Sequence, residues 1–280
     1  MDKPPGPTSH DAVARVRRLF RLRAVGHAGT LDPFATGLLV LLLGPATRLA
    51  RFVEAEAKTY LATARLGVTT DSDDRTGAEI ASVEPAEWPD GARVSGELGR
   101  LQGTALQRPP AYSAKLVGGR RSYRLARRGM PPALQPVEVT VHRIELVDYR
   151  PPFVTFRARV SSGTYLRALG RDLGLALGVG AHLDALRREA VGGFRVEAAV
   201  PLDRLTGAET LLPPEALVAG MPAVTLARDE IGPVGHGRDV LREGPTSGMA
   251  ALLQDGRLRA VARAVPGGWH PEIVLPESPQ

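Results

Sequence analysis

Gly26-His27-Ala28-Gly29-Thr30-Leu31-Asp32-Pro33-Phe34-Ala35-Thr36-Gly37 is the segment that restricts the fold and the chemistry of this chain most. Its three glycines in twelve residues let the backbone approach another group closely. From local chemistry alone, Asp32-Pro33 predicts the start of a helical turn, with Asp32 as N-cap and Pro33 in the first turn. A phosphate-binding P-loop is the other generic interpretation, and it is excluded because the Lys and Ser/Thr of that motif are missing.

The composition is that of an ordinary globular protein. Its 280 residues, 43% hydrophobic and 24% charged, suffice for one large domain or for a main domain with a small one. The absence of cysteine excludes disulfides, a thiol nucleophile and cysteine-ligated metal centres. The six histidines lack the spacing of metal ligands, so the sequence supports no metal site.

No segment suggests a membrane span or a secretory signal. The longest apolar run, Leu38 to Leu43, has six residues, far fewer than the roughly 18 that a spanning helix needs, and it predicts a buried strand. The first residues lack the apolar core of a signal peptide. We therefore expect a cytoplasmic protein with no membrane partner.

The positive charge is concentrated in one segment. The formal net charge of +6 fits a polyanionic partner such as nucleic acid. Residues 108–131 carry seven cations and no acid, with Tyr112 and Tyr123 among them. Gly118-Gly119 interrupts this segment, which predicts a loop or hairpin leading into a short helix. Basic groups interleaved with aromatic rings favour contact with RNA over a merely solvated surface.

Two further segments have an uneven charge. Residues 11–23 contain five arginines and apolar residues at helical spacing, and so predict an amphipathic helix. Residues 71–90 contain seven acids and one arginine. They predict a turn that faces away from RNA, and they lack the spacing of a calcium loop.

Hydrophobic periodicity predicts an α+β fold. Strands are expected at residues 59–67, 138–147 and 153–160. An apolar stripe from Leu166 to Leu177 predicts a helix that ends at Gly178, and a second short helix is expected at residues 181–188. Because strands and helices occur in runs, the sheet should be mixed or largely antiparallel, flanked by helices and loops.

Pro213-Pro214 marks a predicted domain boundary. Beyond it, short β-type segments separated by glycines occur at residues 223–226, 239–241, 249–253 and 259–264. They predict a small β-rich domain at residues 215–280, next to a main domain at residues 1–210.

Five segments resemble, in the same order, the motifs of the bacterial TruB pseudouridine synthases. They lie within residues 2–9, 26–37, 58–74, 109–115 and 161–182. A chance match to one motif is believable, whereas five in order are not. One departure is Leu116, where the family usually has a lysine.

The resemblance implies the pseudouridine-synthase fold with a PUA-like C-terminal RNA-binding domain. It implies an isomerase that converts uridine 55 in the T-loop of tRNA to pseudouridine without a guide RNA, and we expect a monomer. Carried over by position, Asp32 is the nucleophile, Arg167 pairs with it, and Tyr60 stacks on the target base. The residues with an implied role in substrate binding are Tyr60, His27, Tyr165, Leu186, Lys3, Tyr112 and Lys115.

These implied roles agree with the chemistry of the reaction. A C–N glycosidic bond breaks, the uracil turns, and C1′ joins C5, which needs no redox step, metal or cofactor. The carboxylate attacks C1′ or C6 or removes the C2′ proton, and the sequence leaves these three routes open. Desolvation raises the pKa of such a carboxyl group and a guanidinium lowers it. Flipping the base costs a few kcal/mol, and stacking on an aromatic ring returns about 1–3 kcal/mol.

Three alternatives remain at this point. One is a tRNA-binding RNA chaperone in which chemistry is secondary. Another is the archaeal or eukaryotic branch of the family, which works with a guide RNA, although the compact chain favours the stand-alone type. The third is a generic basic RNA-binding protein, which would leave the segment from Gly26 to Gly37 unexplained.

Overall fold

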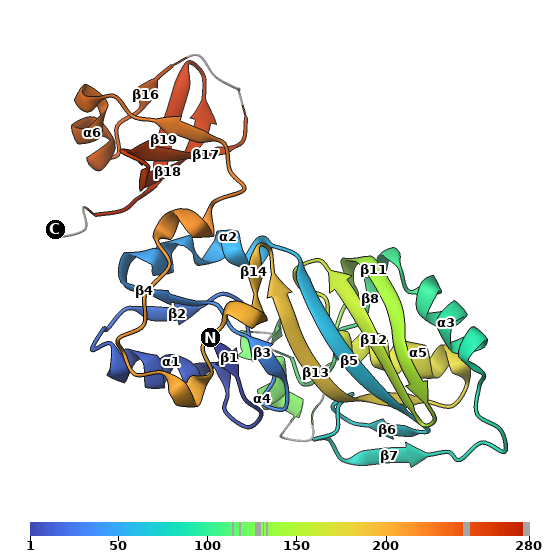
Figure 1. The fold of residues 1–280 in the computed structure, drawn as a ribbon. Helices are drawn as coiled ribbons and strands as arrows, with labels where there is room; N and C mark the ends of the chain where they lie inside the picture. Colours follow the sequence, from blue (N-terminus) through green and yellow to red (C-terminus); the bar gives the residue numbers. More distant parts are fainter. Residues whose placement is uncertain are drawn as a thin grey trace. The chain divides into compact units, whose positions relative to one another are not determined.

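The computed structural model describes residues 1–113, 115–117, 119–126, 130, 132, 134–242 and 247–276 (Figure 1). Two compact units are present, and the chain passes between them more than once. Unit 1 comprises Met1–Ser9, Leu31–Leu39 and Ala55–Leu202, and unit 2 comprises His10–Thr30, Val40–Glu54 and Asp203–Gln280. The domain boundary near residues 210–215 stays a prediction.

Unit 1 is built on an eight-stranded sheet in the order β1-β3-β13-β5-β12-β11-β8, with β14 paired to β13 (Figure 1). The strands are β1 (Asp2–Lys3), β3 (Thr36–Leu38), β5 (Lys58–Leu66), β8 (Gly103–Gln107), β11 (Val137–Arg150), β12 (Phe153–Val160), β13 (Ala181–Val191) and β14 (Phe194–Arg195). The pair of β13 and β3 is parallel, and the other pairs are antiparallel. The predicted α+β class with a mixed, largely antiparallel sheet is confirmed.

One face of this sheet is buried under the helix α5 (Leu166–Leu177) (Figure 1). Strand β5 alternates between buried and partly exposed residues, as the period-2 pattern predicts for a strand with one covered face. A Cβ on Gly174 of α5 would overlap the backbone nitrogen of Ala181 in β13. Glycine therefore lets the helix approach the sheet closely, and the helix ends at Gly178 as predicted.

Unit 1 also contains smaller elements. They are the paired strands β6 (Val68–Thr70) and β7 (Glu79–Ser82), the helix α3 (Gly91–Arg100), the hairpin of β9 (Leu116–Val117) and β10 (Arg120–Arg121), and the helix α4 (Ser122–Ala126). The predicted hairpin followed by a short helix is confirmed for the described residues. Arg127 and Arg128, two of the cations expected to contact RNA, lie outside them.

The helix predicted at residues 181–188 is wrong, because these residues belong to strand β13. The strand pairs with β5 along its length, but its register shifts between Leu183 and Ala185 and again between Arg188 and Ala190. Each bulge interrupts the alternation that marks a strand in sequence. Leu183 and Leu186 are therefore three residues apart, a spacing that is typical of a helix. Pairing with β5, which is distant in sequence, nevertheless makes this segment a strand.

The apolar run from Leu38 to Leu43, predicted as one strand, is also divided. Leu38 ends β3 in the large sheet, whereas Leu41 to Leu43 form β4, which pairs with β2 (Val25–His27). In unit 2 this pair packs against the helix α1 (Ser9–Leu19) through Val13, Val16 and Val25. The predicted amphipathic helix is confirmed, although it ends earlier than expected.

The C-terminal part of unit 2 is a five-stranded sheet in the order β15-β17-β18-β19-β16. The further elements of unit 2 are η1 (Gly44–Leu49), α2 (Ala50–Ala55), η4 (Pro214–Leu217), β15 (Ala223–Thr225), α6 (Arg228–Gly235), β16 (Val240–Leu241), β17 (Met249–Gln254), β18 (Arg257–Val265) and β19 (Gly268–Val274). Of the five strands in this sheet, β15, β16, β17 and β18 were predicted, whereas β19 was not. The helix α6 was not predicted either. The expected β-rich C-terminal part is thus confirmed. Within the described residues, every helix is too short or too polar to cross a membrane.

Candidate active site

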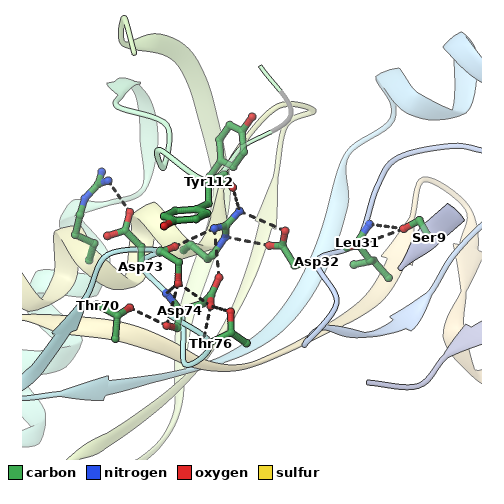
Figure 2. Close-up of polar contacts among 12 residues, drawn as sticks. Ser9, Leu31, Asp32, Thr70, Asp73, Asp74, Thr76 and Tyr112 are labelled. Atoms are coloured by element: carbon green, nitrogen blue, oxygen red, sulfur yellow. Dashed lines mark hydrogen bonds and ion pairs between the residues drawn. The ribbon is translucent and has the colours of Figure 1, made fainter. Parts of the chain in front are cut away.

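Asp32 lies in the loop that leads into β3. The Ala35 amide donates to the Asp32 carbonyl at 3.1 Å, so the chain turns once there and does not continue as a helix. Just before it, the Ser9 hydroxyl accepts from the Leu31 amide at 2.9 Å (Figure 2). After it, Gly37 has a φ of +100°, and a Cβ there would overlap the Arg188 carbonyl. The two ends of the loop are thus held against their neighbours.

The guanidinium of Arg167, in the first turn of α5, organises the site. Its Nε lies 3.0 Å from Asp32 Oδ2, and its Nη2 donates to Asp32 Oδ1 at 3.3 Å and to the Tyr112 carbonyl at 2.8 Å. Its Nη1 donates to the Ser72 carbonyl at 2.9 Å and lies 3.3 Å from Asp74 Oδ2. Figure 2 shows Asp32, Tyr112 and Asp74 around this group. The guanidinium therefore donates three hydrogen bonds and lies within ion-pair distance of two carboxylates.

Exposure distinguishes the two carboxylates. The side chains of Arg167 and Asp74 are each 5% exposed, whereas that of Asp32 is 33% exposed. Asp32 is thus the carboxylate that can meet a substrate. The structure brings together Asp32 and Arg167, as the resemblance implies.

Asp74 lies in the acidic segment that was predicted to form a turn facing away from RNA, and it pairs with Arg167 inside the protein. Its Oδ1 accepts from the Ser72 hydroxyl and from the Thr76 amide, both at 2.9 Å, and from the Thr76 hydroxyl. Ser and Thr next to Asp commonly form such local turns. This residue pattern predicts a turn, but it does not predict that the turn pairs with a buried arginine.

Burial raises the pKa of the Asp32 carboxyl above its ordinary value. The charge of Arg167 opposes this shift, and the nearby carboxylate of Asp74 adds to it. Lys3 also favours the ionised form of Asp32, although its influence is smaller. Burial and Arg167 thus act in opposite directions on the pKa of Asp32, and Arg167 keeps its charge throughout.

Lys3 is fully buried and fixes the backbone beside Asp32. Its Nζ donates to the carbonyls of Pro4 and Pro7 at 2.9 Å each and to that of Pro33 at 3.3 Å. Burial lowers the pKa of Lys3 to about 8. These contacts join the start of the chain to the loop of Asp32.

Tyr60 and Leu186 lie on the buried face of neighbouring strands β5 and β13, with exposed fractions of 8% and 7%. Tyr165 precedes α5, two residues before Arg167. The Gln107 side chain holds its backbone, because Oε1 accepts from the Tyr165 amide at 2.9 Å and Nε2 donates to the Tyr165 carbonyl at 3.2 Å. Burial raises the pKa of the Tyr165 hydroxyl. Gln107 was not predicted, and only long-range pairing identifies it.

The other three residues implied in substrate binding are Tyr112, Lys115 and His27, and of these Tyr112 contacts Arg167. The Tyr112 hydroxyl donates to Asp71 Oδ2 at 3.0 Å. Lys115 is partly buried and precedes the β9–β10 hairpin. His27 ends β2 in unit 2, where its ring lies edge-on to that of His10 at 5.7 Å between centroids. In the described part of the chain, no group of three or more His, Asp or Glu is arranged to hold a metal ion.

Comparison with known families identifies the family of this chain. Residues 17–166 match the family described as TruB family pseudouridylate synthase (N terminal domain), and residues 167–218 match tRNA pseudouridylate synthase B C-terminal domain. The chain belongs to the TruB family of pseudouridylate synthases. Asp32 lies in the first of these two matches, and Arg167 is the first residue of the second.

Bacterial TruB relatives are similar over almost their whole length. A tRNA pseudouridine synthase B of Thermobifida fusca is 45% identical and is aligned over 98% of this chain and 97% of its own. The protein of the same name in Solibacter usitatus is 41% identical, with 98% of each chain covered. That of Mycobacterium tuberculosis strain H37Rv is 42% identical, over 94% of this chain and 90% of its own.

Solved structures share the fold of this TruB-family chain. An H/ACA RNP bound to a substrate RNA containing 2′-deoxyuridine contains a chain with a TM-score of 0.76 and 25% identity, covering 98% of this chain and 84% of that one. A Cbf5-Nop10-Gar1 complex contains another, with a TM-score of 0.73 and 28% identity, covering 94% and 77%. The pseudouridine-synthase fold is therefore confirmed, and the PUA-like nature of the C-terminal sheet stays a resemblance.

Proposed function

We propose that this chain isomerises uridine 55 in the T-loop of tRNA to pseudouridine, with Asp32 as the nucleophile. The observation that carries the proposal is the two-point pairing of Asp32 with Arg167, at 3.0 and 3.3 Å, in a chain of the TruB family. A buried guanidinium holds the carboxylate in one orientation and favours its charged form. That is the requirement for a carboxylate which must act in a largely dry pocket.

The reaction breaks the bond between C1′ and N1 and forms the bond between C1′ and C5. The hydrogen at C5 leaves as a proton, and N1 gains one, so no electron is gained or lost. Asp32 attacks C1′ or C6, or removes the C2′ proton, and its contact with Arg167 suits all three routes. Arg167 compensates the carboxylate charge before the reaction and whenever the carboxylate is released again.

The remaining site residues hold the base and the RNA. Tyr60 stacks on the flipped uracil, and Tyr165 and Leu186 line the pocket around it. Lys3 acts through the backbone next to Asp32, since its ammonium faces three carbonyls. His27 and Lys115 contact the RNA outside the pocket.

The substrate is tRNA, recognised by the protein alone. Bacterial relatives of the same length carry the name tRNA pseudouridine synthase B, which supports this choice. The two structural neighbours are longer than this chain, since 84% of the chain from the H/ACA RNP and 77% of the chain from the Cbf5-Nop10-Gar1 complex are covered. We place the activity in the cytoplasm, where tRNA is abundant, and expect a monomer without a guide RNA.

A direct test uses unmodified tRNA transcripts labelled with tritium at C5 of uracil. We expect the protein to release tritium from the natural transcript, because the new C1′–C5 bond displaces the C5 hydrogen. A transcript with cytidine in place of uridine 55 should release none. Equal release from both transcripts would place the reaction at another uridine, and tight binding without release would favour the RNA chaperone.

A further inference from the structure

Tyr112 contacts the site in two ways at once. Its backbone carbonyl accepts from Arg167 Nη2 at 2.8 Å, and its hydroxyl donates to Asp71 Oδ2 at 3.0 Å. Figure 2 shows its ring above the group of polar contacts that includes Asp32 and Asp74. The sequence predicts that Tyr112 binds RNA, whereas these contacts favour a role inside the protein.

The carbonyl contact belongs to a closed arrangement of three segments. Arg167 and Arg171 lie one turn apart on α5, and both donate to the segment before the basic hairpin. Arg171 Nη2 donates to the Arg108 carbonyl at 3.0 Å, and its Nη1 pairs with Asp73 Oδ2 at 3.0 Å. The helix therefore holds residues 108–112 on one side and the turn at residues 71–74 on the other. The Tyr112 hydroxyl joins these two segments directly.

Asp71 is a fixed acceptor for that hydroxyl. Its Oδ1 accepts from the Ala78 amide at 2.9 Å, across the turn between β6 and β7. A Cβ on Gly77 would overlap the same carboxylate, so the turn is closely packed around it. The carboxylate thus has a defined position from which Oδ2 meets Tyr112.

The position of the Tyr112 carbonyl matters because Arg167 Nη2 has two hydrogens. One reaches this carbonyl and the other reaches Asp32 Oδ1. If the carbonyl moved, a donor on a side chain that is 5% exposed would lose its acceptor. The guanidinium would then reorient, and its two-point contact with Asp32 would weaken.

We propose that the Tyr112 hydroxyl and the Asp71 carboxylate are positioning groups for the reaction, which hold the Tyr112 carbonyl on Arg167 and thereby keep the guanidinium on Asp32. The inference rests on the proposed function of Asp32 as the nucleophile. It assigns Tyr112 a part in the chemical step that is separate from binding RNA.

The test compares Tyr112→Phe with a matched control, Tyr149→Phe. The Tyr149 hydroxyl donates to the Pro89 carbonyl at 2.6 Å, so the control removes a similar hydrogen bond in the same unit. For Tyr112→Phe we expect the single-turnover rate on tRNA to fall about tenfold, with an unchanged Kd. The acid limb of the pH–rate profile should move to higher pH, because Arg167 opposes the raised pKa of Asp32. Tyr149→Phe should keep the wild-type rate and profile.

A double mutant tests whether the two groups act as one. Asp71→Ala should lower the rate as Tyr112→Phe does, and the double variant should be little slower than either single variant. If Tyr112→Phe weakens the Kd for tRNA while the rate and the pH profile stay as in the wild type, the hydroxyl binds RNA and the proposal fails. It also fails if Tyr112→Phe and Tyr149→Phe slow the reaction equally.

A measurement without turnover separates this proposal from the proposed function. The titration of Asp32 can be followed by carbon NMR of labelled aspartate, with Asp32→Asn to assign the signal. We expect the pKa of Asp32 to be higher in Tyr112→Phe than in the wild type, whether or not the protein acts on tRNA. An unchanged titration overturns the positioning role, whereas an inactive wild type overturns only the proposed function.

Discussion

At the level of single residues, the site is one guanidinium shared by two carboxylates. Asp74 is buried and fully engaged by its neighbours, so its contacts fix Arg167 from the protein side. Asp32 occupies the other side of the guanidinium and keeps a partly exposed surface. Removing one member of such a buried group leaves a charge without its partner, which is costly.

Arg167→Lys should reduce the reaction rate strongly. An ammonium has three donors in place of five and cannot bridge both oxygens of Asp32 while meeting Asp74. We expect a loss of roughly 10²-fold in the single-turnover rate, because misplaced reacting groups cost that much. Arg157→Lys is the control, since Arg157 pairs with Glu189 at 2.8 Å and is 41% exposed. Comparable losses in both variants would contradict the special role of Arg167.

Asp74→Asn should shift the pH dependence in a defined direction. The carboxylate of Asp74 helps to raise the pKa of Asp32, so removing its charge lowers that pKa. Because the ionised form of Asp32 reacts, activity is lost as pH falls through this pKa. The acid limb of kcat/KM should therefore move to lower pH in Asp74→Asn, even if the maximum rate decreases. A limb at the wild-type position or at higher pH would show that Asp74 does not act on Asp32 electrostatically.

At the level of elements, prediction from the sequence succeeded where local pattern and burial coincide. The strand at residues 153–160 and the helix from Leu166 to Leu177 lie where the periodicity predicts them. Strand β13 was not predicted, because its two bulges interrupt the alternation of buried and exposed residues that marks a strand. Helix α6 and strand β19 were not predicted either. Each contains a proline, Pro233 in α6 and Pro271 in β19, and proline is unusual inside a helix or a strand.

The site could be predicted only in part for a similar reason. The segment around Asp32 and the residue Arg167 stand in motifs that are recognisable in sequence. Asp74 and Gln107 take part through contacts across long separations, such as the pairing of Gln107 with Tyr165. Neither residue type nor spacing reveals such a contact before the chain is folded.

Close packing of α5 against β13 should make Gly174 intolerant of a side chain. A Cβ there would overlap backbone atoms of β13, which cannot move aside as a flexible side chain can. We expect Gly174→Ala to lower the free energy of unfolding by about 1–3 kcal/mol and to slow the reaction, since α5 carries Arg167. Gly96→Ala in α3 is the control, because nothing lies within 4 Å of a Cβ there.

Denaturant unfolding measures both variants. Gly96→Ala should be neutral or stabilising by about 0.4–1 kcal/mol. If Gly174→Ala is as stable as the wild type, the helix does not approach the sheet as closely as described.

At the level of the whole molecule, the net charge of +6 should govern binding more than chemistry. Basic side chains release counterions from RNA, so the Kd for tRNA should rise steeply with salt, by roughly tenfold or more between 50 and 200 mM. The single-turnover rate at saturating protein should change little, because the guanidinium of Arg167 that pairs with Asp32 is buried and salt screens a buried charge weakly. A rate that falls in parallel with affinity would mean that salt acts on the site itself.

Asp32 is the residue on which the proposed reaction depends most, because it is the nucleophile. Wild type and Asp32→Asn should be compared on tritium-labelled tRNA in single turnover, with tRNA binding measured for both. Asn keeps the size of Asp and can still accept from Arg167, so the substitution removes mainly the reactive charge. We predict that Asp32→Asn binds tRNA with the wild-type Kd and releases no tritium. Release at the wild-type rate by Asp32→Asn would contradict the central claim.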